Sequence, residues 1–307
     1  MVAVSRSLLW QCAVSCSLLV ALGLMITGIR VDPGSATPLL MTVLPMALIA
    51  PFRPWAAKLA PVRLLDTLEC VALLSLLVAV GAVASYLVAL TTTGWVDDRL
   101  ISIDRAMGFD WRAAYGFVAA RPMLRGVAKL AYLSIFTSPT LVLIVLAWTG
   151  RAPRARAFIA AHTLALVVTL VIFWWFPARS ALLATVGSDP AYMPTTGIGH
   201  VAVIEALRAG KLTSIDLAHL FGLITFPSFH AASALLVIWA VYPLRFLRIP
   251  IIALNLGMLL ATPVEGTHYL IDVIGGLGVA VLAIASLYLL PAMMRARLEA
   301  PAHLQPA

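Results

Sequence analysis

Two histidines and one aspartate have the types and spacing that acid, base or nucleophilic chemistry requires. His230 ends the segment FPSFH (226–230), and His268 and Asp272 lie four residues apart in GTHYLID (266–272). Ionisable groups at the edges of apolar segments are costly unless they have a partner or a function. An aspartate four residues after a histidine on one helix face can hold one ring nitrogen and leave the other free to attack. These three residues are therefore the first candidates for an active site.

Ser228 precedes an apolar segment that is predicted to be helical, and serine is a favourable N-cap residue. The first turn of such a helix presents free backbone N–H groups and a positive dipole end, which together favour an anion. His230 lies in the same turn, so its imidazole is expected close to any oxyanion bound there. The pattern predicts an anion site beside His230.

The composition indicates which elements must position these residues. Of the 307 residues, 62% are hydrophobic and 11% are charged, and the mean hydropathy is +1.02. Charged residues make up about a quarter of ordinary soluble domains, so the sequence predicts an all-α, polytopic membrane protein. Apolar runs long enough to cross a bilayer lie at 7–29, 68–92, 129–149, 157–176 and 268–291, with shorter runs at 37–52, 227–243 and 249–265.

The distribution of Lys and Arg supports eight spans. When all eight runs cross the membrane, the short connections on one face contain Arg6, Arg53, Lys58, Arg63, Arg151, Arg154, Arg156, Arg245, Arg248, Arg295 and Arg297. The short connections on the other face contain only Arg30. Because short cytoplasmic connections are enriched in Lys and Arg, both termini are predicted to be cytoplasmic, and a bacterial inner membrane is the expected location. The net charge of +8 follows from loops that face anionic lipid, so no nucleic-acid partner is indicated.

Two long connections interrupt the spans on the outer face. The first, residues 93–125, has apolar residues at helical spacing, which predicts an amphipathic helix lying in the interface; they are Ile103, Met107, Trp111 and Tyr115. The second, residues 177–225, contains several Pro and Gly residues and a short helix predicted near residues 201–208. Its length and its position before Ser228 predict a lid or a substrate-shaping segment.

This topology places four polar side chains at the outer ends of their spans: His230, His268, Asp272 and Arg179. The topology is assigned from the charges of the loops alone, without use of these four residues. They nevertheless lie at the same depth in the membrane. An extracytoplasmic site at the membrane boundary is therefore predicted.

The order of these residues resembles the type 2 phosphatidic acid phosphatase superfamily. The shared motifs are Pro-Ser-x-His ending at His230, a helical hairpin, and His-x-x-x-Asp-x-x-x-Gly at His268, Asp272 and Gly276. The forms Phe-Pro-Ser-x-His and His-Tyr-x-x-Asp are closer to the branch related to inositol phosphorylceramide synthase, and the likeness extends to residues 104–111.

The resemblance covers roughly residues 68–291 and implies the family's six-helix membrane core. Two N-terminal transmembrane helices are added to it here. The expected division is an N-terminal helix pair at 1–67, the core at 68–292 and a cytoplasmic tail at 293–307.

The resemblance also implies a metal-independent transfer of a phosphoester through a phosphohistidine, with no cofactor. The family's nucleophile maps onto His268, its orienting acid onto Asp272, and its second histidine, which protonates the leaving alcohol, onto His230. Ser228 and the adjoining backbone map onto the phosphate cradle. The implied substrate is a lipid-linked phosphate or phosphodiester of the membrane, and the acceptor is water or an alcohol such as inositol.

The cationic part of the family pattern is incomplete in this chain. Arg179 stands at the arginine position of the first motif, but Ile172 occupies the lysine position and Ser180 the proline position. The third motif usually begins Ser-Arg, where this chain has Ala261-Thr262. A phosphate dianion beside lipid is costly without partners, so the 177–225 loop is expected to supply a base.

The best candidates for that base are Arg208 and Lys211, with Arg121 and Arg125 of the first connection behind them. Alternatively, helix dipoles and hydroxyl groups hold most of the phosphate.

Three other functions are compatible with these residues. The missing Lys and Arg fit a catalytically inactive, lipid-binding membrane protein. A proton-coupled transporter is disfavoured because the ionisable groups lie at one face and not at mid-membrane. Two histidines and one carboxylate are also a metal-ligand set. Cys12, Cys16 and Cys70 lie in or beside apolar runs without a CxxC pair, so neither a zinc site nor a disulfide framework is predicted.

Overall fold

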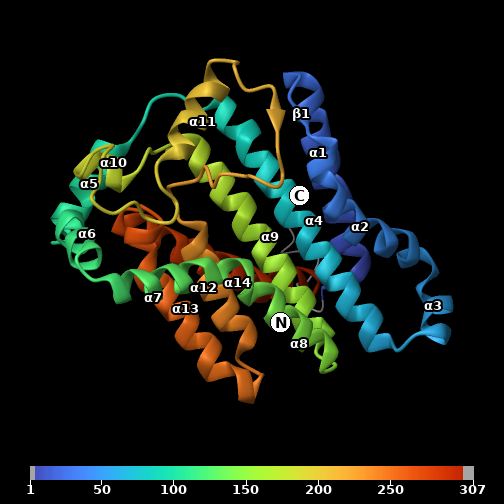
Figure 1. Cartoon of the computed structure of the whole chain (residues 1–307). Coiled ribbons are helices and arrows are strands. Elements are labelled where there is room, and N and C mark those ends of the chain that lie inside the picture. The colour runs from blue at the N-terminus through green and yellow to red at the C-terminus, as the bar shows by residue number, and fades with distance from the viewer. Residues whose placement is uncertain (1–3, 300–307) are drawn as a thin grey trace.

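Helices form most of the computed structural model, which describes residues 4–299 and the side-chain surroundings through residue 289 (Figure 1). The main helices are α1 (Arg6–Thr27), α2 (Pro33–Ile49), α4 (Val62–Thr91), α8 (Ser138–Trp148), α9 (Ala152–Trp175), α12 (Phe229–Val241), α13 (Arg245–Glu265) and α14 (Leu270–Glu299). Shorter elements are η1 (Ala50–Phe52), α3 (Arg53–Leu59), α5 (Asp97–Ala106), α6 (Trp111–Ala119), α7 (Pro122–Leu133), η2 (Ser134–Phe136), α10 (Ala181–Thr185) and α11 (Gly199–Arg208). The predicted fold class, an all-α, multi-pass membrane protein, is confirmed.

Within the described residues, six helical segments are long and apolar enough to cross a membrane: α1, Pro33–Leu59, α4, α9, α13 and the Leu270–Leu289 part of α14. The pair Pro122–Phe136 and Ser138–Trp148, bent by 49°, adds a seventh when it is counted as one span. With 13 residues, α12 is only about 20 Å long, which is shorter than a hydrocarbon core of roughly 30 Å. All eight predicted segments thus contain a helix, while the count of eight spans and the orientation of the termini stay predictions.

The core lies where α4, α8, α9, α12 and α14 pack together. Phe158 and small residues of α9, such as Ala161 and Ala165, are fully buried there. Gly81 of α4 meets α9 so closely that an added Cβ would lie 2.0 Å from Cδ2 of Leu166. Small residues let membrane helices approach closely, so these helices form a tightly packed frame for the site.

An ion cluster centred on Glu69 attaches the N-terminal helices to α4. Glu69 accepts hydrogen bonds from Arg6 (2.7 and 2.8 Å), from Nε1 of Trp10 (2.8 Å) and from Arg53 (2.9 Å). Arg53 also pairs with Asp66 at 2.6 Å. Because each buried charge has an opposite partner, the cluster avoids the large cost of an uncompensated charge.

The expected boundary at residues 67 and 68 falls inside α4, which begins at Val62. The division into a helix pair, a core and a tail stays a prediction. Residues 300–307 of the expected tail lie outside the described residues.

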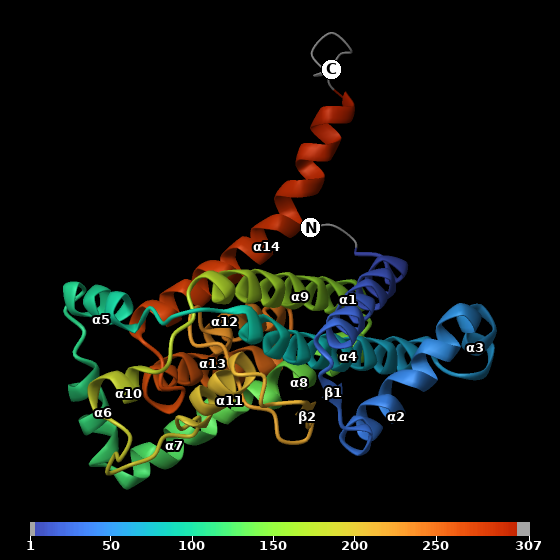
Figure 2. The same ribbon diagram turned by 90° about the horizontal axis from the view of Figure 1, so that it is seen from above.

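The two views place α5, α6 and α10 together at one end of the molecule, and α2 and α3 at the opposite end (Figures 1 and 2). The first long connection, which is predicted to lie on the outer face, forms two helices, α5 and α6, where one amphipathic helix was expected. The chain turns between them at Gly108, which has a positive φ of 77°. Trp111 and Tyr115 are buried and stacked with ring centroids 5.7 Å apart. The apolar face of α6 that contains these two rings thus packs into the protein.

The second outer connection contains α11, which confirms the short helix expected near residues 201–208. It also contains a strand that the sequence did not indicate, β2 (Ser214–Ile215), which pairs in parallel with β1 (Arg30–Val31). Oγ of Ser35 accepts a hydrogen bond from the N–H of Leu217 at 3.0 Å. The turn between α1 and α2 therefore holds this connection in place.

Candidate active site

His268 lies in the short segment between α13 and α14, and not on a helix as its spacing from Asp272 predicted. Thr267 has a positive φ of 55°, so the chain turns before α14 begins at Leu270. Nδ1 of His268 nevertheless lies 3.2 Å from Oδ2 of Asp272, which is fully buried. The same oxygen accepts a hydrogen bond from the backbone N–H of Tyr269 at 2.9 Å. Asp272 therefore holds one ring nitrogen and leaves Nε2 as the nitrogen for chemistry.

His230 lies next to His268, in the first turn of α12. The centroids of the two rings are 6.4 Å apart and the ring planes are inclined at 56°. Nε2 of His230 is buried and has no hydrogen-bond partner among the described residues. A buried polar atom without a partner costs free energy, so this nitrogen marks a position that a polar ligand would satisfy.

Tyr132 of α7 covers the other face of the His230 ring. The two rings are stacked, with centroids 4.1 Å apart and planes inclined at 10°. Oη of Tyr132 lies 3.4 Å from Nδ1 of His230 and 2.9 Å from Oγ1 of Thr196. In a stacked pair the hydroxyl approaches Nδ1 from outside the imidazole plane, where hydrogen bonds are weak. We therefore take Thr196 as the main partner of the hydroxyl, which leaves both nitrogens of His230 available.

The ends of α12 and α14 meet at Ser228. Its Oγ caps α12 by accepting a hydrogen bond from the N–H of Ala231 at 3.4 Å, and its own N–H donates to the carbonyl of Asp272 at 2.9 Å. A Cβ on Gly276 would lie 2.1 Å from the carbonyl oxygen of Ser228. Glycine is therefore needed at position 276 to let α14 approach Ser228.

Asp104 of α5 caps the helix that carries Asp272. Its carboxylate accepts hydrogen bonds from the backbone N–H groups of Leu270 and Ile271, at 2.8 and 2.9 Å. A carboxylate at a helix N-terminus is stabilised both by these N–H groups and by the helix dipole. Burial raises the pKa of Asp104, and the two backbone donors oppose that shift.

Trp111 and Asp97 hold the remainder of the segment around His268. Nε1 of Trp111 donates to the carbonyl oxygens of His268 (2.9 Å) and Pro263 (3.2 Å). Asp97 accepts a hydrogen bond from Oη of Tyr269 at 2.8 Å. The first outer connection thus fixes the backbone on which His268 lies.

Glu265, which is fully buried at the end of α13, anchors residues 192–196 of the second long connection, the segment predicted to act as a lid, beside the histidines. Its carboxylate accepts hydrogen bonds from Oη of Tyr192 (2.7 Å) and from Oγ1 and N–H of Thr195 (2.6 and 3.1 Å). Its carbonyl accepts from the N–H of Thr196 at 3.0 Å. Since Thr196 also contacts Tyr132, the lid is connected to the ring that covers His230.

The family comparison concerns this same region. The model of the PAP2 superfamily matches residues 98–286, which is more than half of the chain and includes both histidines and Asp272. The chain belongs to the PAP2 superfamily. Members of this superfamily are membrane phosphatases and phosphotransferases. Comparisons with curated proteins and with solved structures give no significant match.

In this PAP2 chain, two of the predicted phosphate ligands, Arg179 and Arg208, gather at Trp95. Arg208 lies over the Trp95 ring, 4.1 Å from its centroid, and donates to Oγ1 of Thr92 at 2.8 Å. The guanidinium of Arg179 lies 5.4 Å from the same centroid. Burial lowers the pKa of Arg208, and the charge of Arg179 adds to this effect while Glu205 opposes it.

The structure thus brings His230, His268 and Asp272 together with Ser228. It does not show Arg179 or Arg208 in contact with either histidine, and Lys211 is exposed. The assignment of these three bases to phosphate binding stays a prediction.

Arg125 is a further base with an indirect connection to the histidines, through Tyr132. It lies two turns before Tyr132 on α7, and seven residues return to the same helix face. Its guanidinium is 5.1 Å from the centroid of the Tyr192 ring, and its buried Nε has no partner among the described residues. Arg121, by contrast, stacks on Phe117 at 3.8 Å on the exposed side of the same region.

Burial makes the histidines of this region difficult to protonate. It lowers the pKa of His268 to about 4, against the opposing effect of the Thr225 carbonyl. His268 is therefore neutral near pH 7, which is the state in which imidazole is nucleophilic. His200 of α11 is bonded through Nε2 to the Arg179 carbonyl, and burial lowers its pKa, with a further contribution from His268.

The two-histidine, one-carboxylate metal site has no support in the geometry. In the part of the chain that the structure describes, no three His, Cys, Asp or Glu side chains are arranged to hold a metal ion.

Several residues at the site gave no signal of their role in the sequence. Tyr132, Thr196 and Glu265 contact the histidines or the lid across separations of 64 to 98 residues, and no local motif contains them. Asp104 and Trp111 did carry a signal, because both lie in the 104–111 segment that resembles the family. That signal did not reveal that they support His268.

Proposed function

We propose that this PAP2 protein is an integral-membrane phosphatase or phosphotransferase that acts on a lipid-linked phosphate or phosphodiester through a phosphohistidine. The observation that carries the proposal is the pairing of His268, oriented by Asp272 at 3.2 Å, with a second buried histidine 6.4 Å away, centroid to centroid. Nucleophile, orienting acid and second proton carrier are the groups that such a transfer requires.

In the first step, Nε2 of His268 attacks the phosphorus atom and an N–P bond forms as the P–O bond to the leaving alcohol breaks. His230 is protonated in the complex because the negative charge of the bound phosphate favours its charged form, and it gives this proton to the departing alkoxide. Asp272 stabilises the positive charge that develops on the His268 ring. The enzyme then carries a phosphoryl group on His268 and a neutral His230.

In the second step, water or an alcohol gives its proton to His230 and attacks the phosphohistidine. The N–P bond breaks, and both histidines return to their starting states. Water as acceptor gives a phosphatase, and an alcohol such as inositol gives a phosphotransferase. The branch related to inositol phosphorylceramide synthase is proposed from FPSFH (226–230) and from His268-Tyr269 followed by Asp272.

Backbone donors support phosphate binding at this position. The first helical hydrogen bond of α12 runs from the N–H of Ala232 to the carbonyl of Ser228. The N–H groups of Phe229 and His230 precede it and are free to bind an oxyanion. Arg125 is our proposed source of a cation, with Arg179, Arg208 and Lys211 reaching the phosphate only after side-chain rearrangement. We further propose that the site faces the extracytoplasmic side and that no metal takes part.

One observation favours a second candidate function, a catalytically inactive lipid-binding protein. Arg179 and Arg208 lie against Trp95, and neither contacts His230 or His268. If no cation reaches the phosphate, the developing negative charge of the transition state lacks its usual stabilisation.

The deciding experiment offers the purified protein isotope-labelled lipid phosphates and phosphodiesters, with and without inositol, and identifies the products by mass. The proposal predicts turnover that survives a metal chelator and is inhibited by orthovanadate, which mimics a phosphoryl group bound to histidine. Asp272→Asn is the matched variant that keeps the shape of the site. Binding without turnover for every substrate, in the wild-type protein, would support the inactive lipid-binding protein instead.

A further inference from the structure

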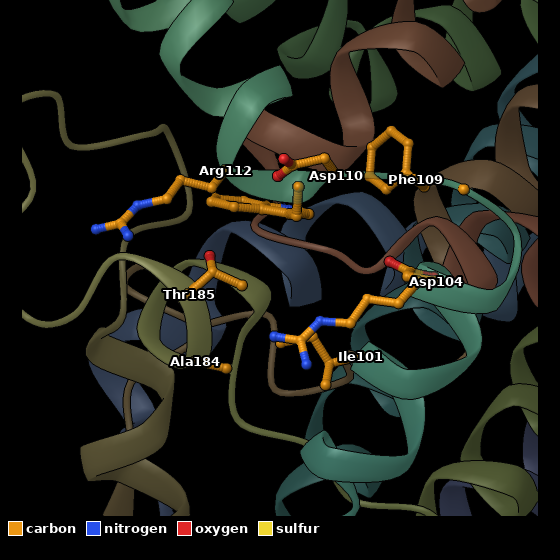
Figure 3. Close-up of a pocket in the computed structure, with 10 residues that line it drawn as sticks. Ile101, Asp104, Phe109, Asp110, Arg112, Ala184 and Thr185 are labelled. Atoms are coloured by element: carbon orange, nitrogen blue, oxygen red, sulfur yellow. The ribbon is translucent and has the colours of Figure 1, made fainter.

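A cavity of about 470 Å³ lies behind the His268 segment, between α5, α6 and α10. Figure 3 shows Asp104, Phe109 and Asp110 on one side of it, and Ala184 and Thr185 of α10 on the other. Ile101, Arg105, Gly108, Trp111 and Arg112 complete the lining. Neither His230 nor His268 belongs to the lining, so this space is separate from the candidate active site. Its volume is in the range of sites for small ligands, which is roughly 300 to 1,000 Å³.

The acidic groups of the lining already have partners. Both carboxylate oxygens of Asp104 accept hydrogen bonds from the N-terminus of α14. Oδ1 of Asp110 caps α6 by accepting from the N–H of Ala113 at 3.0 Å. Each carboxylate therefore has a helix N-terminus, with its positive dipole end, as its electrostatic partner.

The basic groups of the lining, Arg105 and Arg112, have no such electrostatic partner in the part of the chain that the structure describes. Among residues 4–289, neither Arg105 nor Arg112 has an ion pair, a hydrogen bond or an aromatic ring against its guanidinium. Two unpaired guanidinium groups on one cavity select for an anion, and the planar fork of N–H donors fits the oxygens of a phosphate.

We propose that this cavity is a second binding site, and that its ligand is a phosphate ester of a small polyol. Arg105 would bind the phosphate oxygens, and Arg112, whose guanidinium points away from Asp110 and Phe109 in Figure 3, would turn toward them when the ligand binds. Oδ2 of Asp110 and the hydroxyl of Thr185 would accept hydrogen bonds from the polyol hydroxyls, while Trp111 and Phe109 would contact its carbon skeleton. The ligand is a lipid head group or a free sugar phosphate, since both present the same chemistry.

Two residues of the cavity also support the candidate active site. Trp111 donates to the carbonyl of His268, and Asp104 caps the helix that carries Asp272. An occupant of the cavity would therefore contact the groups that hold the nucleophile in place. The binding itself does not depend on the proposed phosphohistidine chemistry.

Isothermal titration calorimetry on the full-length protein in detergent tests this site. One arm uses glycerol 3-phosphate, and the other uses a short-chain phosphatidylglycerol, with the matching phosphatidylcholine for comparison. Arg105→Gln and Arg112→Gln should each weaken binding by roughly tenfold or more, because each variant loses a charge-assisted hydrogen bond to the phosphate. Arg105→Lys, which keeps the charge but loses the fork, should give an intermediate affinity.

Two further proteins separate this site from the histidines. Arg99→Gln removes an exposed arginine of the same helix α5 that does not line the cavity, and it should bind as the wild type does. His268→Ala should also keep the cavity affinity, whether or not the protein proves to be an enzyme. The inference is wrong if neither probe binds, if the arginine variants bind like the wild type, or if binding disappears in His268→Ala. Preference for one probe identifies the source of the ligand.

Discussion

The two histidines differ in their surroundings, and the difference suits them to different steps. His268 has one nitrogen fixed by a carboxylate, so its ring has a defined orientation and a partner for positive charge. His230 is held by ring stacking on Tyr132, which fixes the plane of the ring without occupying Nε2. A fixed nucleophile and a proton carrier with free nitrogens is the division of roles that phosphoryl transfer through histidine requires.

Asp272→Asn tests the orienting role at the scale of one residue. The amide still fits the space and can bond to the His268 ring, but it stabilises the imidazolium poorly and favours the wrong tautomer. We expect activity to fall by roughly 10² to 10⁴, with a thermal transition close to that of the wild type. Activity assays and thermal melting in detergent measure both quantities. Near-normal turnover by a folded Asp272→Asn protein would contradict the assignment.

At the scale of elements, α5 and α6 hold the turn between α13 and α14 in place through hydrogen bonds, and we call these two helices the clamp. Asp104, Trp111 and Asp97 bind consecutive parts of residues 268–271. This turn contains a residue with positive φ and two helix ends, which on their own leave backbone groups unsatisfied. The clamp supplies those partners and so determines where His268 lies.

Asp104→Asn should therefore reduce catalysis without contacting substrate. The substitution replaces the charge-assisted hydrogen bonds from Leu270 and Ile271 with weaker ones, and it places an amide N–H against these backbone donors. The expected loss of interaction free energy at this turn is about 2 kcal/mol. We expect kcat to fall by about tenfold or more while KM changes little, because only the position of His268 is affected. Trp111→Phe should act in the same direction.

The matched control is Asp98→Asn, an exposed aspartate of the same helix. Steady-state kinetics of the three variants give the comparison. Equal loss of activity in Asp98→Asn, or a rise in KM alone in Asp104→Asn, would count against a positioning role.

His200 attaches α11 to the carbonyl of Arg179, and its titration should make the stability of the protein depend on pH. Burial holds the pKa of His200 below its usual value, so the unfolded chain binds a proton there before the folded chain does. The contribution is complete above pH of about 6.5 and is lost as the pH falls toward the pKa of the folded protein. Between pH 7 and 5, the Tm of the wild type should fall more steeply than that of His200→Gln. His219→Gln, at an exposed histidine of the same connection, is the control, and identical slopes for all three proteins would refute the prediction.

The elements were largely predictable because their signals are local. Each apolar run of the required length contains a helix, and Ser228 caps α12 as its residue type predicts. The continuous helix over residues 103–115 was wrong because Gly108 permits a left-handed turn that the apolar spacing does not reveal.

The contacts that complete the site were not predictable. Stacking of Tyr132 on His230 and the bonds of Glu265 to the lid depend on packing between distant segments. The same holds for the pairing of β1 with β2, since two residues are too few to show a strand pattern.

For the whole molecule, the distribution of basic residues defines a topology that the packing leaves open. Six helical segments in the described chain are long enough to span, a bent pair adds a seventh, and α12 is short. With eight spans, the distribution of Lys and Arg predicts that both termini are cytoplasmic and that the candidate site lies outside.

Cysteine labelling of intact cells tests this topology, starting from a protein in which the three native cysteines are replaced by serine. Ser188→Cys should react with a membrane-impermeant maleimide. Thr149→Cys and Tyr242→Cys should react only after permeabilisation, because both lie at exposed positions on the predicted inner side. Tyr242 is the decisive position, since its labelling from outside would show that α12 does not cross the membrane.

The central claim is that His268 carries the phosphoryl group, and trapping of the phosphoprotein tests it most directly. Rapid quenching after addition of an aryl phosphate, followed by mass spectrometry under alkaline conditions, should locate an acid-labile phosphate on His268 in the wild type. His230→Ala should also be labelled, because an aryl alcohol leaves without a proton donor, whereas His268→Ala should never be labelled. Undiminished labelling of His268→Ala would contradict the account and indicate another nucleophile.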